Sequence, residues 1–187
     1  MAENNNTKIL YHTKFLQLKS TTSPSGGEWV YAHRPNAKDV VIIVPLITEE
    51  NQKRVLFLRE RRPPMYAEDR GTYNIGLAAG LVGDEREGES VLDAIKTELL
   101  EETGLVADKI TIVAKNISSS AGCVSETSTI AIAEISNSTP IQEPITDGGI
   151  IVERMLINLE DIPTFLKEEQ RKGNTISGQT LAGLYFL

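Results

Sequence analysis

Three glutamates near the middle of the sequence have the residue type and spacing to hold a divalent cation. Glu98, Glu101 and Glu102 stand at positions i, i+3 and i+4, which puts their carboxylates side by side on one helical surface. Carboxylate oxygens are ligands that Mg²⁺ and Mn²⁺ prefer, with Ca²⁺ as a competitor. The alternative interpretation is a solvated acidic helix face, because glutamate is a good helix former.

The sequence around these glutamates predicts the helix that would position them. Ser90 is a preferred N-cap residue, and Asp93 three positions later completes a capping-box pattern. Apolar residues recur at helical spacing at Leu92, Ile95 and Leu99. Gly104 is a suitable C-cap. Upstream, residues 61–88 are rich in glycine, which predicts tight turns or a close approach of the backbone to another group.

The rest of the pattern predicts an α/β (α+β) fold. Residues 40–47 are apolar on both faces, which is typical of a central strand. Residues 9–34 would form an antiparallel hairpin or small sheet, which must pack on the rest of the chain or on a second copy to be stable. The expected strands cover residues 9–19, 28–34, 40–47, 54–60, 110–114, 129–134 and 150–157, and further helices cover 160–172 and 179–186.

The composition limits the class of protein. The chain has 187 residues, enough for one compact domain or one domain with a small appendage. Its 26 acidic residues outnumber 19 basic ones, whereas a dedicated duplex nucleic-acid binder needs a basic face. We expect a cytoplasmic protein that binds no membrane, because Cys123 is the only cysteine and there is neither a signal sequence nor an apolar run long enough for a bilayer.

The glycine segment and the helix together carry a long spaced pattern. Residues 83–105 read GDEREGESVLDAIKTELLEETGL. This stretch resembles the Nudix box, Gly-x5-Glu-x7-Arg-Glu-U-x-Glu-Glu-x-Gly-U, where U is a bulky aliphatic residue. Every fixed position matches except Thr97, which stands where the family has an arginine that helps to hold the catalytic glutamate. We therefore expect a weaker metal site than the family norm.

Other segments resemble the ADP-ribose pyrophosphatase branch of that family. Residues 77–81 resemble its Pro-Ala-Gly segment, and residues 61–65 its strand-end substrate segment. Residues 120–126 resemble its Ser-Pro-Gly-x-x-Ser-Glu loop, with alanine in place of the proline. The resemblance implies a Nudix-type mixed β-sheet sandwiched between helices. It also implies two units: residues 1–38, an N-terminal β-hairpin unit for dimerisation and substrate binding, and residues 39–187, the Nudix hydrolase domain.

The resemblance assigns roles in metal binding. Glu98 and Glu102 would be the principal ligands of Mg²⁺, or of Mn²⁺, and Glu101 a further or water-mediated ligand. The carbonyl oxygen of Ala79 would complete the set. Gly80 would let the backbone approach closely, since a larger residue there would block it.

The resemblance also assigns substrate-binding residues. In this branch, aromatic residues of the N-terminal strands from both subunits stack on an adenine. Trp29 and Arg34 occupy matching positions in the hairpin, and Arg62 matches a substrate-binding arginine. An ordinary packing role for Trp29 is the alternative. Because this binding mode uses strands from both subunits, the resemblance also implies a homodimer that pairs through the N-terminal strands.

The general base is not assigned by residue type. The branch supplies a glutamate from the loop before the last long strand, but the aligned position here is Gly149 or Ile150. Asp147 or Glu143 could substitute through a loop shift. Glu126, or a glutamate of the box, could also serve, because geometry decides which group is the base.

The expected function is divalent-metal-dependent hydrolysis of the diphosphate bond of ADP-ribose or of a related nucleoside diphosphate sugar. The products would be a nucleoside monophosphate and a sugar phosphate. One alternative is a catalytically weak or inactive nucleotide-sugar binding or sensor protein on the same fold. The other is a Nudix hydrolase with a different substrate, such as a dinucleoside polyphosphate or coenzyme A.

Overall fold

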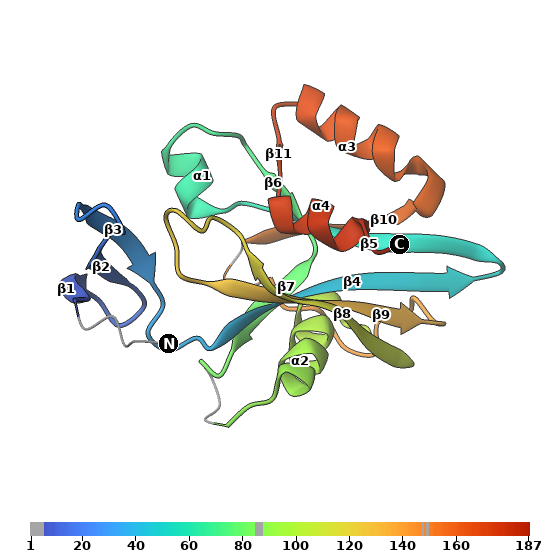
Figure 1. The fold of residues 1–187 in the computed structure, drawn as a ribbon. Helices are drawn as coiled ribbons and strands as arrows, with labels where there is room; N and C mark the ends of the chain where they lie inside the picture. Colours follow the sequence, from blue (N-terminus) through green and yellow to red (C-terminus); the bar gives the residue numbers. More distant parts are fainter. Residues whose placement is uncertain (1–5, 85–87, 147, 149) are drawn as a thin grey trace.

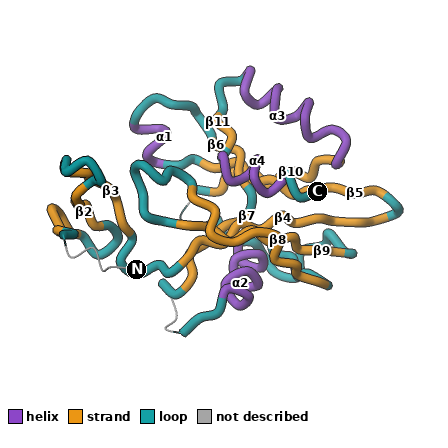
Figure 2. The backbone as a smooth tube through the Cα atoms, viewed as in Figure 1, coloured by secondary structure: helices purple, strands orange, loops and turns teal. Residues whose placement is uncertain are grey.

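The chain forms two separate β-sheets in the computed structural model, which describes residues 6–84, 88–146, 148 and 150–187 (Figures 1 and 2). The smaller sheet is antiparallel and contains β1 (Lys8–His12), β2 (Gln17–Thr22) and β3 (Glu28–His33). Within the described residues the larger sheet has eight strands: β4 (Asp39–Glu49), β5 (Gln52–Glu60), β6 (Asn74–Gly76), β7 (Ala78–Val82), β8 (Lys109–Ser118), β9 (Thr127–Ile135), β10 (Ile151–Asn158) and β11 (Thr175–Ile176).

Helices cover both faces of the larger sheet. α2 (Val91–Thr103) packs against β7 and β4 on one face, and α4 (Gly178–Leu184) packs against β4, β6 and β9 on the other (Figure 1). The other helical segments described are α1 (Pro63–Ala67), a 3-10 helix (Leu159–Asp161) and α3 (Ile162–Arg171), which lies on the α4 side. This mixed sheet between helices confirms the predicted fold class.

β4 is the central strand, as its apolar sequence predicts. It pairs with β7 along its first half, with β5 near its end, and with β9 in parallel along most of its length. Val41 and Ile43 belong to the core on the α2 side, while Ile42 and Val44 belong to the core on the α4 side. Because successive side chains point to opposite faces, one continuous apolar strand builds both cores.

The ends of α2 lie where the sequence places them. The Ser90 hydroxyl accepts a hydrogen bond from the Asp93 N–H at 3.1 Å, as in an N-cap. Gly104 ends the helix with φ of 73°, a left-handed conformation that glycine adopts without strain. Ile95 and Leu99 are buried against the sheet. The carboxylates of α2 are thus carried by a helix that is fixed at both ends.

One sequence-based expectation about the elements was wrong, and another was incomplete. The single strand expected over residues 9–19 is two strands, because a turn at residues 13–16 separates β1 from β2; the Thr13 hydroxyl accepts from the Leu16 N–H at 2.9 Å there. In the glycine-rich segment, tight turns or a close approach of the backbone were expected; Gly76 and Gly80 do lie close to carboxylates, but the segment also contains α1, β6 and β7. Isoleucine, leucine and alanine between the glycines fill the core along this segment.

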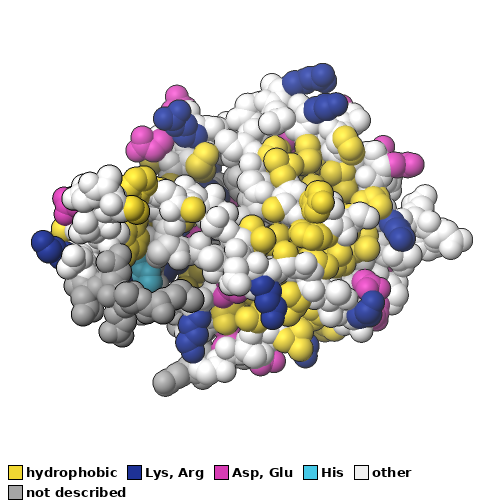
Figure 3. Space-filling view, viewed as in Figure 1, with side chains coloured by type: hydrophobic (Ala, Val, Ile, Leu, Met, Phe, Trp, Pro, Cys, Tyr) yellow, Lys and Arg dark blue, Asp and Glu magenta, His cyan; other side chains and the backbone are white. Residues whose placement is uncertain are grey.

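The small sheet exposes many apolar side chains. Figure 3 shows apolar atoms on it at the left of the molecule. The large exposed apolar residues of β1 to β3 and their turns are Ile9, Leu10, Tyr11, Phe15, Leu16, Leu18, Trp29 and Val30. No described helix is both long and apolar enough to cross a bilayer.

Candidate active site

A cavity of about 600 Å³ lies beside α2 and reaches to the start of α4. Most of the candidate site residues predicted from the sequence line this cavity. The nominated residues that line it are Arg34, Arg62, Ala79, Gly80, Glu98, Glu101, Glu102 and Glu126. Trp29 is absent from this lining, and Asp147 lies outside the described residues.

The α2 wall of the cavity is in direct contact with the backbone of β7. The Ala79 N–H donates a hydrogen bond to Glu102 Oε2 at 2.9 Å, and Glu102 is buried. A Cβ atom at Gly80 would overlap the Glu98 carboxylate. Glycine is therefore required at this position for the carboxylate to lie where it does, as the sequence predicts for Gly80.

The donor chemistry of this wall fits a hard divalent cation. Glu98, Glu101 and Glu102 offer carboxylate oxygens beside the Ala79–Gly80 backbone, and Mg²⁺ and Mn²⁺ prefer such ligands. Among the described residues, no group of three His, Cys, Asp or Glu side chains is already placed to hold an ion.

Glu89, the first glutamate of the box, does not line the cavity. Its Oε2 accepts a hydrogen bond from the Gly83 N–H at 3.0 Å, and it thereby closes the loop before α2.

The opposite wall is a polar cluster around a buried carboxylate. Glu60, at the end of β5, is 2% exposed and pairs through Oε1 with Arg62. Its Oε2 accepts a hydrogen bond from Asn74 Nδ2 at 2.9 Å. A Cβ atom at Gly76 would lie 2.7 Å from the same oxygen, so the glycine makes room for the carboxylate. Arg62 thus lines the cavity while its guanidinium is paired with a buried carboxylate.

A third group joins the small sheet to the loop of residues 120–126. Ala32 on β3 donates its N–H to the Cys123 carbonyl at 2.8 Å, and Ser125 donates its N–H to the Ala32 carbonyl at 3.1 Å. Arg34 Nε donates to Glu126 Oε2 at 2.8 Å. Arg34 and Glu126, both predicted site residues, therefore meet as an ion pair at the rim of the cavity.

His33 lies within the same contact between sheet and loop. Its Nδ1 is 2.9 Å from the Ser125 hydroxyl. Burial and the nearby charge of Lys19 lower the pKa of His33 below its ordinary value. The imidazole therefore favours the neutral form, in which one ring nitrogen can accept a hydrogen bond.

Trp29 lies at the same contact but outside the cavity of its own chain. Its Nε1 donates to the Gly122 carbonyl at 2.8 Å, and the side chain remains 51% exposed. This hydrogen bond satisfies the only N–H group of the indole ring. The ring itself does not line the cavity of its own chain. A stacking role for Trp29 stays a prediction.

The base candidates are dispersed. Glu126 lines the cavity in its pair with Arg34. Glu143 is exposed and absent from the lining, while Asp147 and Gly149 lie outside the described residues. Ile150, the other aligned position, accepts a backbone hydrogen bond from Arg61.

Sequence reasoning missed several residues of the cavity. The unassigned polar residues in its lining are Glu60, Asn74, Asp84, Ser177, Gln179 and Thr180. Asp84 follows the first glycine of the box, and Glu60 ends an apolar strand two positions before Arg62, so their proximity to assigned residues was a usable signal. The last three come from the start of α4, which has no motif in the sequence.

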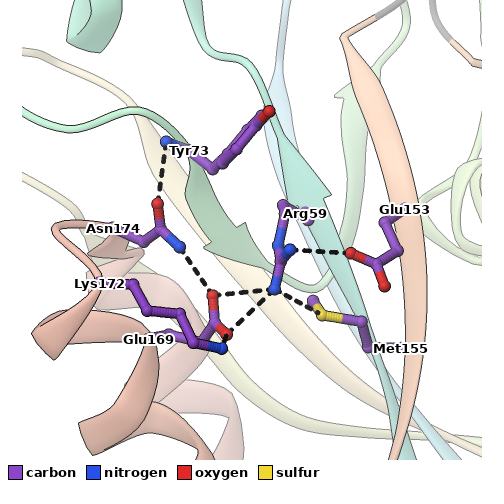
Figure 4. A network of polar contacts seen from close by, with 7 residues as sticks. All are labelled: Arg59, Tyr73, Glu153, Met155, Glu169, Lys172 and Asn174. Atoms are coloured by element: carbon purple, nitrogen blue, oxygen red, sulfur yellow. Dashed lines mark hydrogen bonds and ion pairs between the residues drawn. The ribbon is translucent and has the colours of Figure 1, made fainter.

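A separate polar network surrounds Glu169 (Figure 4). Glu169 on α3 is 1% exposed and accepts hydrogen bonds from Arg59, Lys172 and Asn174. Burial raises the pKa of this carboxyl, but the hydrogen bonds from Lys172 and Asn174 and the charge of Arg59 together leave the pKa below its ordinary value. Arg59 also pairs with Glu153 at 2.9 Å, so the network ties α3 to β5 and β10.

Comparison with known proteins places the chain. No curated protein matches the sequence. A solved structure titled ADP compounds hydrolase is similar over 96% of this chain and 88% of that one, with 20% identity and a TM-score of 0.66. The Nudix domain of Shewanella oneidensis NrtR, solved with ADP ribose, is similar over 67% of this chain and 75% of that one, with 19% identity and a TM-score of 0.51. At such identities the likeness concerns the fold.

A family model gives the more direct assignment. The model described as the NUDIX domain matches residues 37–176, a stretch that includes β4 to β11, α2 and α3. Because this match spans most of the chain, the protein belongs to the Nudix family.

Proposed function

We propose that this protein hydrolyses the diphosphate bond of ADP-ribose or of a related nucleoside diphosphate sugar, giving a nucleoside monophosphate and a sugar phosphate. One observation carries the proposal: three carboxylates of α2 and two arginines line the same cavity. A diphosphate needs both kinds of group, since cations must offset its charge while water attacks phosphorus. The name of one similar structure, an ADP compounds hydrolase, and the ADP ribose bound in the other support this substrate class.

The α2 wall would hold the metal. Members of the Nudix family generally use a divalent metal, and Mg²⁺, or Mn²⁺, suits the oxygen donors of Glu98, Glu101, Glu102 and the Ala79 carbonyl. When bound, such an ion neutralises phosphate oxygens and lowers the pKa of a coordinated water. Gly80 keeps the space in which the Glu98 carboxylate can lie against the backbone.

The two arginines would orient the substrate. A guanidinium carries five N–H donors in a fixed plane, so it can hold a carboxylate and contact a phosphate or ribose oxygen as well. Glu60 fixes the direction of Arg62, and Glu126 fixes that of Arg34. Among the described base candidates outside α2, we favour Glu126, because it lines the cavity and Glu143 does not.

A second candidate function is a binding or sensor protein with little or no catalytic activity. Two observations favour it: Thr97 replaces the arginine of the box, and no three acidic side chains of the described residues already converge on an ion site. The three clustered carboxylates count against it, because a protein that only binds an anionic ligand gains nothing from placing them beside it.

We also propose that residues 1–38 form a separate unit that pairs two chains into a homodimer. The exposed apolar side chains of β1 to β3 would be covered by the second copy, and Trp29 would then face the partner's cavity or the interface. Sedimentation at micromolar protein should show a dimer. A clean monomer under these conditions would refute the pairing.

The function is tested by product analysis over a panel of nucleoside diphosphate compounds with Mg²⁺ or Mn²⁺. We expect turnover by the unaltered protein, very little by Glu102→Gln, and normal turnover by Glu168→Gln, a matched change at an exposed glutamate of α3. If the protein binds ADP-ribose and turns over none of the diphosphates, the enzyme proposal fails and the binding function replaces it.

A further inference from the structure

The C-terminal end of α2 is held by donors from outside the helix. The last carbonyls of any helix lack partners within it and must find others. Here the Glu101 carbonyl accepts from the Ile145 N–H at 2.7 Å, and the Gly104 carbonyl accepts from the Ile141 N–H at 2.8 Å. The segment of residues 140–145 therefore lies along the helix end that carries Glu101 and Glu102.

Arg154 on β10 completes this arrangement. Its Nε donates a hydrogen bond to the Glu102 carbonyl, and its Nη2 donates to the Ile145 carbonyl. One guanidinium thus connects three parts of the molecule: the sheet, the end of α2, and the segment that contributes Ile145 to the cavity wall. Its planar fork suits two acceptors at once, which a lysine could not match.

The charge of Arg154 also suits this position. A cation is favoured at a helix C-terminus, where the carbonyl dipoles point outward. Burial lowers the pKa of Arg154, and the neighbouring charges of Glu102 and Glu143 oppose this effect. An arginine remains protonated under ordinary conditions, so the guanidinium keeps its charge beside a carboxylate proposed to bind metal.

We propose that Arg154 is a positioning residue: by its two backbone hydrogen bonds it holds Glu101 and Glu102, and the Ile145 segment that borders them, in place for metal binding. The proposal rests on the metal-dependent function proposed above. If Arg154 only stabilised the fold, its loss would lower the free energy of unfolding and leave metal affinity unchanged in the folded protein.

The test measures Mn²⁺ binding without substrate, by electron paramagnetic resonance of the full chain. Arg154→Met keeps the length of the side chain and removes its donors. Because residues that orient metal ligands are worth about 10–100-fold in affinity, we expect the Mn²⁺ dissociation constant to rise by about that factor. Amide hydrogen exchange at Ile145, whose N–H donates to the Glu101 carbonyl, should also become faster, because Arg154 no longer holds the Ile145 carbonyl beside the helix end.

A second variant keeps the proposal testable if Arg154→Met does not fold. Arg154→Lys retains the charge and can reach one carbonyl, so we expect an Mn²⁺ affinity about 3–10-fold below that of the unaltered protein, as for one lost hydrogen bond. In turnover with Mg²⁺, kcat should fall more than KM rises, because the substrate-binding arginines are not touched.

The matched control is Arg54→Met, which removes a half-buried arginine that pairs with Glu49 far from the cavity. It should lower stability and leave Mn²⁺ affinity unchanged. The proposal is overturned if folded Arg154 variants bind Mn²⁺ as the unaltered protein does, or if Arg54→Met weakens binding equally. Absence of diphosphate turnover in a protein that binds Mn²⁺ would instead refute the proposed function and leave the role of Arg154 standing.

Discussion

Two groups of carboxylates in this protein have opposite surroundings. Glu169 on α3 is enclosed by Arg59, Lys172 and Asn174, so the protein itself supplies the counter-charges (Figure 4). The glutamates of α2 line an open cavity, where Glu102 accepts from the backbone of Ala79 and Glu98 lies against Gly80.

The difference separates a carboxylate that contributes to stability from carboxylates that we propose contribute to chemistry. A buried charge surrounded by protein donors is satisfied in the folded state, and removing it leaves its partners unpaired. Acidic groups gathered on one helix face at a cavity repel one another, and a divalent cation bound among them would relieve that repulsion. The same residue type therefore predicts different losses at the two places: activity at α2 and folding stability at α3.

The largest expected effect is the loss of turnover in Glu102→Gln. Glutamine can still accept the hydrogen bond of the Ala79 N–H, so the fold should persist, but the charge of a metal ligand is gone. If the ligand is worth about 4 kcal/mol of transition-state stabilisation, kcat falls by about 10³-fold. Steady-state kinetics with ADP-ribose checks this, and a thermal unfolding curve close to that of the unaltered protein is required alongside.

Gly80→Ala should cost activity without changing any charge. The added methyl group would occupy the space of the Glu98 carboxylate, which must move, and we expect a loss of about 10–100-fold in metal affinity or kcat. Gly27→Ala is a suitable control, because a Cβ atom there would meet only Ser23 Oγ at an ordinary 3.5 Å. Equal activity of the two variants would contradict the placement of Glu98.

Glu169→Gln should show the reverse pattern. The loss of charge-assisted hydrogen bonds from Arg59 and Lys172 should lower the free energy of unfolding by about 2 kcal/mol. For a chain of this length that corresponds to a melting temperature lower by about 4–8 °C. At a temperature well below the transition, turnover should stay within about twofold of that of the unaltered protein, because Glu169 lies outside the cavity.

The smallest expected effect is a pH dependence of the stability difference between the unaltered protein and Glu169→Gln. The pKa of Glu169 in the folded protein lies below its ordinary value of 4.5, so its stabilising contribution is complete above that value and is lost as the pH falls through the lower folded-state pKa. The stability difference between the unaltered protein and Glu169→Gln should therefore shrink in acid. Denaturant unfolding at pH 7 and in the acid range measures it, and a difference that grows toward low pH would contradict the direction of the shift.

Local patterns in the sequence predicted helix α2 and its two ends well. Ser90, Asp93 and Gly104 mark both ends of the helix, and the spacing of its glutamates places them on one side. These signals lie within about one helix length, where backbone geometry alone decides which side chains are neighbours. The same holds for β4, whose apolar run predicts its central place.

The other half of the site depends on contacts that no local pattern contains. Asn74 meets Glu60 because β6 pairs with β5, and Arg154 reaches the Glu102 carbonyl from 52 positions away because β10 pairs with β5 on its other edge. Strand order sets these neighbours, and local patterns in a single sequence do not reveal it. The turn at residues 13–16 was missed for a different reason, since it contains neither glycine nor proline.

The most direct test compares kcat for ADP-ribose with saturating Mg²⁺ in Glu102→Gln and Glu169→Gln, both measured against the unaltered protein. We predict a fall of about 10³-fold in the first and a change within about twofold in the second. Equal losses in the two variants, or no hydrolysis by the unaltered protein, would contradict the assignment of chemistry to α2.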